Sequence, residues 1–180
     1  MEERNFEYDK DAAEAFSDPF FFALCIHIEN IQKEENPPEI KKEYIEGLET
    51  LLGQEDISSS PVILEELKKC APLIHTSGVE NEMCVMLGHV VQNVEKASRA
   101  LVQGRVFREC IALYRKKPQT VKKIVFLLTV LNNTLKELPL EIKCAGCDPK
   151  QLEEIGLADK HLDATAQERL KVLRKAFEIE

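Results

Sequence analysis

Glycine and proline are scarce in this chain, and strand-forming patterns are missing. The 180 residues include only 7 Gly and 8 Pro, which gather at a few points. Leu, Ile, Glu and Lys dominate the stretches between those points. This composition is typical of helices joined by short turns, and it predicts a single all-α protein.

A positive net charge and long apolar runs are also missing. The 24 Lys and Arg are outnumbered by 32 Asp and Glu, which gives a net charge of -8. Such a charge repels phosphates and anionic lipid, so we expect neither nucleic acid nor a membrane as a partner. No apolar run approaches the ~20 residues that span a bilayer. The first ten residues carry acids where a secretory signal carries bases, which predicts a cytoplasmic protein.

The six cysteines offer little for a metal or a disulfide. Cys25, Cys70, Cys84 and Cys110 lie in apolar stretches, where a thiol behaves as a small core residue. Cys144 and Cys147 form one Cys-x-x-Cys, but a structural zinc site needs about four ligands and no second pair follows. We therefore expect reduced thiols, no metal and no cofactor.

Familiar catalytic motifs are absent as well. The four histidines occur singly, and the chain has no Gly-x-Ser-x-Gly, no His-Glu-x-x-His and no glycine-rich phosphate loop. The acidic pairs are adjacent in sequence, so on a helix they point in different directions. We expect a binding protein that is not an enzyme.

What the chain does contain is an internal repeat. The stretch Cys84–Asn93 aligns with Ile124–Asn133 at a shift of 40 residues, which places Leu87 on Leu127. A similar pattern occurs upstream in Tyr44–Gln54, at a shift of 39. Repeats of this length are typical of stacked helical units.

Shorter apolar stretches lie between these copies. We expect intermediate helices over 62–75 and 102–116, which match each other at the same shift, and a weaker last copy over 170–177. The predicted unit is a pair of helices per ~40 residues, as in armadillo and HEAT repeats. The fold expected is an armadillo-like or HEAT-like solenoid with a right-handed superhelical twist.

Two local signals predict where helices begin and end. Gly104 can adopt a positive φ, which a sharp corner between helices needs, so we expect a short helix to end there. Thr120 is a candidate N-cap for a long helix with a broad apolar face, predicted over 120–138.

The repeat divides the chain into three parts. Residues 1–38 are predicted to form an N-terminal helical cap with a frayed start. Residues 39–139 form the armadillo-like repeats, and residues 140–180 form a degenerate last repeat or a second cap.

The residues of the repeat region resemble a known family. The run Leu51–Asp56, the motif Met86–Asn93, the corner at Gly104 and the run Thr120–Leu128 follow one another in order and spacing. They are similar to the armadillo-type nucleotide exchange factors of heat-shock 70 chaperones, the Fes/HspBP and Sil proteins. The resemblance covers about residues 38–139, and its most specific part is the Leu-Gly-x-x-x-Gln-Asn of Leu87–Asn93.

That resemblance implies a function. A monomeric co-chaperone of this kind holds one lobe of the chaperone's ATPase domain in its concave face, opens the nucleotide cleft and promotes ADP release. It needs no catalytic side chain, because its preference for the open ATPase conformation drives the change.

The contact residues are predicted on the long helices. Amides near the ends of those helices and acidic or basic neighbours would line the concave face, although Asn also commonly caps helix ends. The candidate partner-binding residues are Gln54, Asp56, Ser58, Gln92, Asn93, Lys122, Lys123, Asn132 and Asn133.

Two other functions remain open from the residues alone. The same surface could serve a protein-binding adaptor that has no effect on nucleotide exchange. A basic groove for RNA has only one supporting observation, a cluster of basic residues over 99–117.

Overall fold

The computed structural model describes residues 19–54 and 60–179. Every regular element within these residues is a helix, which confirms the all-α prediction. None of the described helices combines the length and the apolar composition that crossing a bilayer requires.

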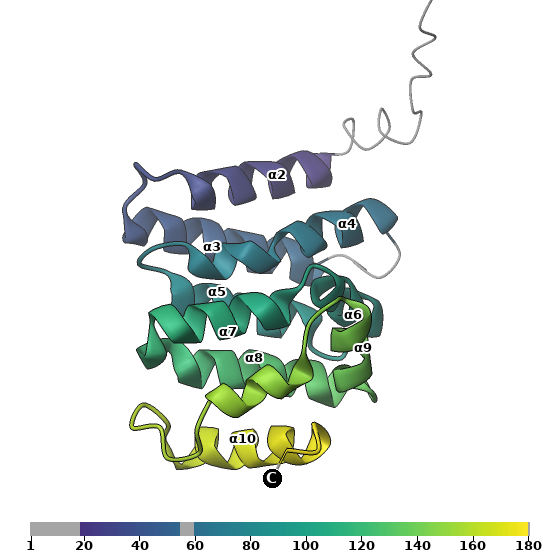
Figure 1. Ribbon diagram of the computed structural model, residues 1–180. Coiled ribbons are helices and arrows are strands. Elements are labelled where there is room, and N and C mark those ends of the chain that lie inside the picture. Colours follow the sequence, from purple (N-terminus) through teal and green to yellow (C-terminus); the bar gives the residue numbers. More distant parts are fainter. Residues whose placement is uncertain (1–18, 55–59, 180) are drawn as a thin grey trace, which may run out of the picture.

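Five helices form one continuous row through the molecule. Each packs against the next, so that α2 lies at one end of the stack and α10 at the other (Figure 1). The row consists of α2 (Pro19–Gln32), α3 (Pro38–Gln54), α5 (Glu80–Val91), α8 (Val121–Thr134) and α10 (Ala164–Ala176).

The last four helices of this row run in the same direction. Near their starts, Lys42 of α3 contacts Glu82 of α5, and Lys122 of α8 contacts Asp163 at the start of α10. Further along α3 and α5, Glu49 meets His89, and the backbone N–H of Asn93 just after α5 donates to Thr134 at the end of α8. Corresponding ends therefore meet in all three neighbouring pairs. These helices are thus parallel, and each must be followed by elements that return the chain.

The returning elements form two further rows. The short helices α4 (Pro61–Lys69), α6 (Glu95–Gln103) and α9 (Leu138–Cys144) pack against one another in that order. The third row has α7 (Val106–Lys116) at its centre, flanked by the 3-10 helices Ala71–His75 and Pro149–Glu154.

The unit therefore contains three elements, whereas the sequence suggested two. The helix expected over 62–75 is divided into α4 and a 3-10 helix, and the one expected over 102–116 is divided between α6 and α7. The apolar pattern continues across both breaks, because residues on either side of each corner face the same core. Seven of the polar contacts between elements join residues 34 to 45 positions apart, about one unit.

Gly104 ends α6 as predicted, but the expected positive φ is wrong. Its φ is -68°, and Arg105 takes the left-handed conformation with φ 66°. The glycine is needed for space: a Cβ at this position would lie 2.2 Å from the backbone oxygen of Lys68 in α4.

The helix predicted over 120–138 ends earlier, at Thr134. Leu135 is extended and buried, and α9 begins at Leu138 with Pro139 in its first turn. Thr120 precedes α8 but does not cap it, because its hydroxyl donates to the Lys117 carbonyl in a 3-10 turn, Pro118–Thr120.

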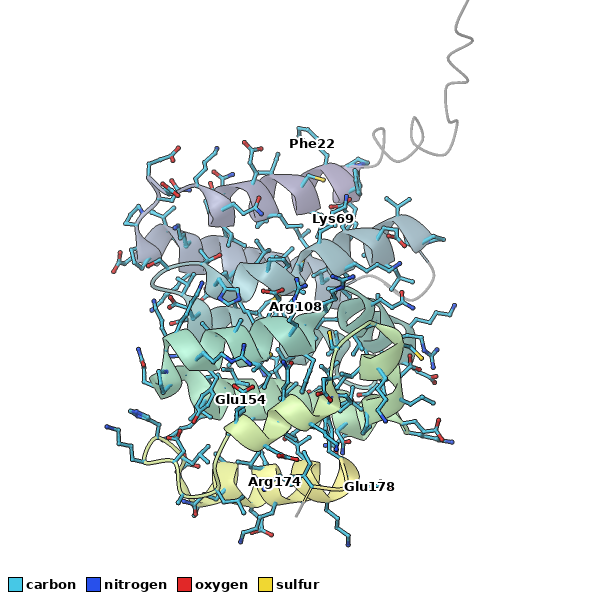
Figure 2. The ribbon with its side chains drawn as sticks, viewed as in Figure 1. Phe22, Lys69, Arg108, Glu154, Arg174 and Glu178 are labelled. Carbon is cyan, nitrogen blue, oxygen red and sulfur yellow. The ribbon has the colours of Figure 1, made fainter. Side chains whose placement is uncertain are left out.

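The two ends of the row differ from its middle. Helix α2 packs on α3 and leaves Phe22 62% exposed on its outer side (Figure 2). At the other end, each of the three rows continues. Helix α10 extends the long row, α9 extends the short row, and the 3-10 helix Pro149–Glu154 extends the third. The boundary placed at residue 139 falls inside α9.

Cysteines contribute to the core as predicted. Cys70, Cys84 and Cys110 are buried free thiols, and Cys25 is half-buried. Burial raises the pKa of Cys70 and of Cys84 to about 12, so both remain protonated thiols at neutral pH. Cys144 is exposed at the end of α9.

Candidate partner-binding face

The row of parallel helices presents one side to solvent. We call this side of α3, α5, α8 and α10 the long-helix face. A groove of about 380 Å³ lies on it between α3 and α5, with one lysine reaching it from α8. Its lining residues are Lys42, Ile45, Glu46, Glu49, Asn81, Glu82, Val85 and Lys123.

A ladder of side chains crosses the long-helix face, with one residue from each helix. Glu49 Oε1 of α3 lies 2.7 Å from His89 Nδ1 of α5. The His89 ring meets the edge of Phe126 from α8, with 5.7 Å between ring centroids. Arg169 of α10 places its guanidinium carbon 5.5 Å from the Phe126 ring centroid. The four helices are thus braced across their exposed side.

Gly88 makes the middle step of this ladder possible. It is buried within α5, and a Cβ there would lie 2.6 Å from Phe126 Cε1. The missing side chain lets the Phe126 ring lie directly over α5. The glycine of the Leu87–Asn93 motif therefore has a packing role between two units.

Two ion pairs tie the helix starts together. Lys42 Nζ lies 2.8 Å from Glu82 Oε1, and this hydrogen bond raises the pKa of Lys42. Lys122 Nζ lies 3.1 Å from Asp163 Oδ2. The pKa of Asp163 is lowered, first by the backbone N–H of Ala166 and then by Lys122. Both pairs are exposed, so each contributes little to stability.

The structure separates the two predicted lysines. Lys122 is held by Asp163, whereas Lys123 lines the groove and forms no ion pair with a residue that the structure describes. Adjacent residues on a helix point about 100° apart, which explains their different surroundings. Lys123 is the predicted site residue that the groove includes.

The predicted amides lie near helix ends but in different conformations. Asn93 follows α5 in the left-handed conformation, with φ 63°, and its backbone N–H donates to Thr134 Oγ1 at 3.3 Å. Gln92, before it, is exposed. Asn132 and Asn133 lie within α8, half-buried and exposed respectively. Asn93 and Asn133 align in the repeat, but Asn93 follows the end of α5 whereas Asn133 lies within α8.

The remaining predicted residues belong to the end of α3 and the segment after it. Gln54 is the last residue of α3. Its side chain lies outside the described part of the structure, as do Asp56 and Ser58.

Sequence reasoning missed the residues that make the ladder. Glu49 and His89 are 40 positions apart, which is the length of the predicted repeat, so they occupy equivalent positions in successive units. Lys42 and Glu82 have opposite charges at about the same spacing. A search for complementary charges one repeat apart would have found both contacts, whereas nothing in the sequence pairs Phe126 with Gly88.

The basic cluster over 99–117 does not form a free positive surface. Arg99 contacts Glu95 and Glu141. Arg115 donates to both carboxylate oxygens of Glu154, from Nε and from Nη2. The other basic residues with carboxylate partners are Arg108, which contacts Glu109, and Lys117, which contacts Glu80. Figure 2 shows Arg108 and Glu154 on the same side of the molecule. These contacts neutralise most of the charge that an RNA groove would need.

Comparisons of the chain with known protein families, with curated proteins and with solved structures found no match.

Proposed function

We propose that this protein is an armadillo-like solenoid that binds the ATPase domain of a heat-shock 70 chaperone and promotes ADP release. The solenoid is supported by the three rows of elements and by parallel long helices, which an up-and-down bundle does not have. Each unit packs mainly on its neighbours, as in repeat proteins. The proposed twist is right-handed, and the proposed compartment is the cytoplasm.

The observation that carries the binding proposal is the groove on the long-helix face. It draws residues from three successive units, and its walls carry charges of both signs beside Ile45 and Val85. A surface braced by cross-helix contacts changes little on binding, so less free energy is lost in ordering it. Together with the resemblance of Leu87–Asn93 to the exchange factors, this groove is the proposed contact with the ATPase lobe.

Exchange requires only a difference in affinity. A protein that binds the open ATPase conformation ~3 kcal/mol more tightly than the closed one raises the open population on the order of a hundredfold. A rigid face suits this role because it cannot follow the lobe when the cleft closes. ADP leaves from the open cleft, and no group on this protein takes part in chemistry.

Lys123 is the proposed main contact for an acidic patch on the lobe. Lys42 and Lys122 are engaged by Glu82 and Asp163, and the ladder residues contact one another, so these side chains are less available to a partner. Gly88 and Asn93 serve packing and chain direction, so the motif that carries the resemblance acts through the shape of the face.

The test measures release of fluorescent ADP from a chaperone ATPase domain. The protein is expected to accelerate release, and Lys123→Glu is expected to weaken binding about tenfold. Lys136→Glu makes the same charge change on an exposed residue between α8 and α9, and it should leave release unchanged. Equal effects of both variants would contradict the proposed contact.

The adaptor function is the alternative outcome of this experiment. Binding to the ATPase domain that depends on Lys123, with no acceleration of release, would assign the same groove to an adaptor. No binding to any cytosolic heat-shock 70 protein would overturn the choice of partner while leaving the solenoid proposal intact.

A further inference from the structure

A second pocket, of about 560 Å³, lies away from the groove on the long-helix face. It is formed by the corner after α2, the first turns of α3, and the 3-10 helix Ala71–His75 with the turn that follows it. Its lining residues are Gln32, Glu34, Lys41, Pro72, Leu73, His75, Thr76 and Ser77. None of these residues has a role in the proposed function.

Lys41 is the unusual residue in this pocket. It is only 6% exposed, yet its side-chain ammonium forms no hydrogen bond or ion pair with any residue that the structure describes. Within the described residues, every side-chain nitrogen or oxygen that is fully shielded from solvent has a hydrogen-bond partner. The Lys41 ammonium is therefore not fully shielded from solvent, and Lys41 is one of the residues that line the pocket.

A buried stem that ends in an unpaired ammonium favours an anion. The buried stem holds the ammonium in place, and no described carboxylate occupies it, so a negative group placed beside it can form a charge-assisted hydrogen bond. Lys42, the next residue, illustrates the contrast, because it is exposed and already paired with Glu82.

The walls supply neutral groups that complement an oxyanion. Gln32, Thr76 and Ser77 each carry a side-chain N–H or O–H donor, and all three line the pocket. The turn with Ser77 is held close to α3, because Gly78 has φ 85° and a Cβ there would lie 2.8 Å from Pro38 Cγ. This contact fixes the hydroxyl side of the pocket relative to the lysine side.

Two carboxylates limit how much negative charge the pocket accepts. One is Glu34, which lies on the pocket wall. The other is Glu109, whose Oε2 lies 3.0 Å from Nε2 of the lining residue His75, so that ring nitrogen is already engaged. With Lys41 as its one unpaired cation, the pocket suits a single oxyanion and disfavours a polyanion.

The size and the apolar wall indicate that the oxyanion belongs to a larger molecule. A volume of about 560 Å³ far exceeds that of a lone phosphate and falls in the range of small-molecule sites. Pro72 and Leu73 offer an apolar surface to the rest of the ligand. We infer that this pocket binds a small molecule that carries one phosphate or carboxylate group, with Lys41 as the anion-binding residue.

The test uses three probes with the same aromatic body, namely phenyl phosphate, benzoate and benzyl alcohol. Each is titrated into the full chain while the backbone amide resonances of Ser77 and Gly78 are followed by NMR. One or both anions are expected to shift these resonances with at least about tenfold higher affinity than benzyl alcohol. The tighter anion identifies the head group.

Variants connect the binding to Lys41. Lys41→Met keeps most of the buried stem and should weaken anion binding about tenfold, whereas Lys41→Arg should restore most of it. Lys136→Met, the matched control, should bind as the unchanged protein does. The Gly88 amide, on another face of the molecule, reports whether each variant is folded.

Three results would overturn the inference. They are equal binding of anions and benzyl alcohol, unchanged anion binding by folded Lys41→Met, and no shift at Ser77 or Gly78 with any probe. If Lys41→Met does not fold, Ser77→Ala replaces it and is expected to weaken anion binding about threefold. Unchanged anion binding by folded Ser77→Ala would then overturn the inference. Chaperone binding is not involved, so these results do not depend on the proposed function.

Discussion

The long helices and the short helices contact their neighbouring units in different ways. Helices α5 and α8 pack against each other, and each contributes buried apolar side chains to the core, including Met83, Leu87, Ile124 and Leu127. Helices α4 and α6 approach so closely that at Gly104 the backbone lies against the Lys68 carbonyl. The long row is thus held by side chains and the short row partly by backbone contact.

This difference determines which substitutions each row tolerates. Neighbouring side chains can adopt new rotamers and so make room for an added group, whereas a backbone carbonyl moves only if its whole helix moves. The long row should fail when its core chemistry changes, and the short row should fail when a single methyl group is added. The predictions below test that contrast.

Introducing a charge into the long row should have the largest effect. Leu127 is 0% exposed in α8, so Leu127→Asp buries a carboxylate with no partner, at a cost of several kcal/mol. Because whole domains are stable by only ~5–15 kcal/mol, we expect largely unfolded protein by circular dichroism and urea titration. Val172→Asp, on the exposed side of α10, should remain within about 0.5 kcal/mol of the unchanged protein. A folded Leu127→Asp protein would show that α8 is not in the core.

Adding one methyl group to the short row should have the next largest effect. Gly104→Ala places a Cβ where the Lys68 carbonyl lies, and we expect the free energy of unfolding to fall by ~3 kcal/mol.

Gly88→Ala is the matched change in the long row. Its Cβ meets the Phe126 side chain, which can move, and alanine gains about 1 kcal/mol of helix propensity over glycine. We expect its stability to stay within about 1 kcal/mol of the unchanged protein, measured in the same urea titration. Equal losses for the two variants would remove the distinction between backbone and side-chain contact.

Loss of an ion pair that links the rows, with one buried member, should have an intermediate effect. Glu80, at the start of α5 and 8% exposed, accepts a hydrogen bond from Lys117, which follows α7. Glu80→Gln should lower the free energy of unfolding by ~1.5 kcal/mol at neutral pH.

The same pair predicts a pH dependence. Burial acts to raise the pKa of Glu80, but hydrogen bonds from Lys117 and from backbone N–H groups outweigh it, so the pKa is lowered. A lowered pKa contributes stability above the unfolded value of about 4.3, and this contribution is lost as pH falls through the folded value. Between about pH 6 and pH 3 the unchanged protein should lose more stability than Glu80→Gln. Parallel pH profiles would contradict the lowered pKa.

The smallest effect should be a gain. Gly53 is exposed in the last turn of α3, and a Cβ there would meet nothing within 4 Å. Gly53→Ala should raise the free energy of unfolding by ~0.5–1 kcal/mol through helix propensity alone. A loss of stability would mean that this end of α3 has contacts beyond those described.

The sequence predicted helices better than it predicted where they break. Leu128, Leu131, Leu135 and Leu138 continue one helical spacing, and all four are buried, so the run reads as one helix. Thr134 ends α8 while accepting the Asn93 backbone N–H from the previous unit. Pro139 marks the start of α9 in the sequence, but the apolar spacing alone does not show that α8 ends before it.

The candidate site was predicted only in part. Lys123 was expected at the partner surface, and the groove includes it. The neighbouring Lys122 was given the same role, but Asp163 holds it. Local sequence cannot separate two adjacent lysines, because their roles depend on which helix packs beside each.

The sequence by itself determined the all-helical content, the ~40-residue period and most of the core, because apolar spacing and repeat length are properties of the chain. Only the tertiary structure decided the three-element unit, the need for glycine at Gly104, the packing of Phe126 over Gly88, and the ammonium of Lys41 that has no partner among the described residues. These features depend on which segments meet across a unit boundary. The space left between two helices and the partner that reaches a buried charge are set by packing between distant residues, which local sequence patterns do not record.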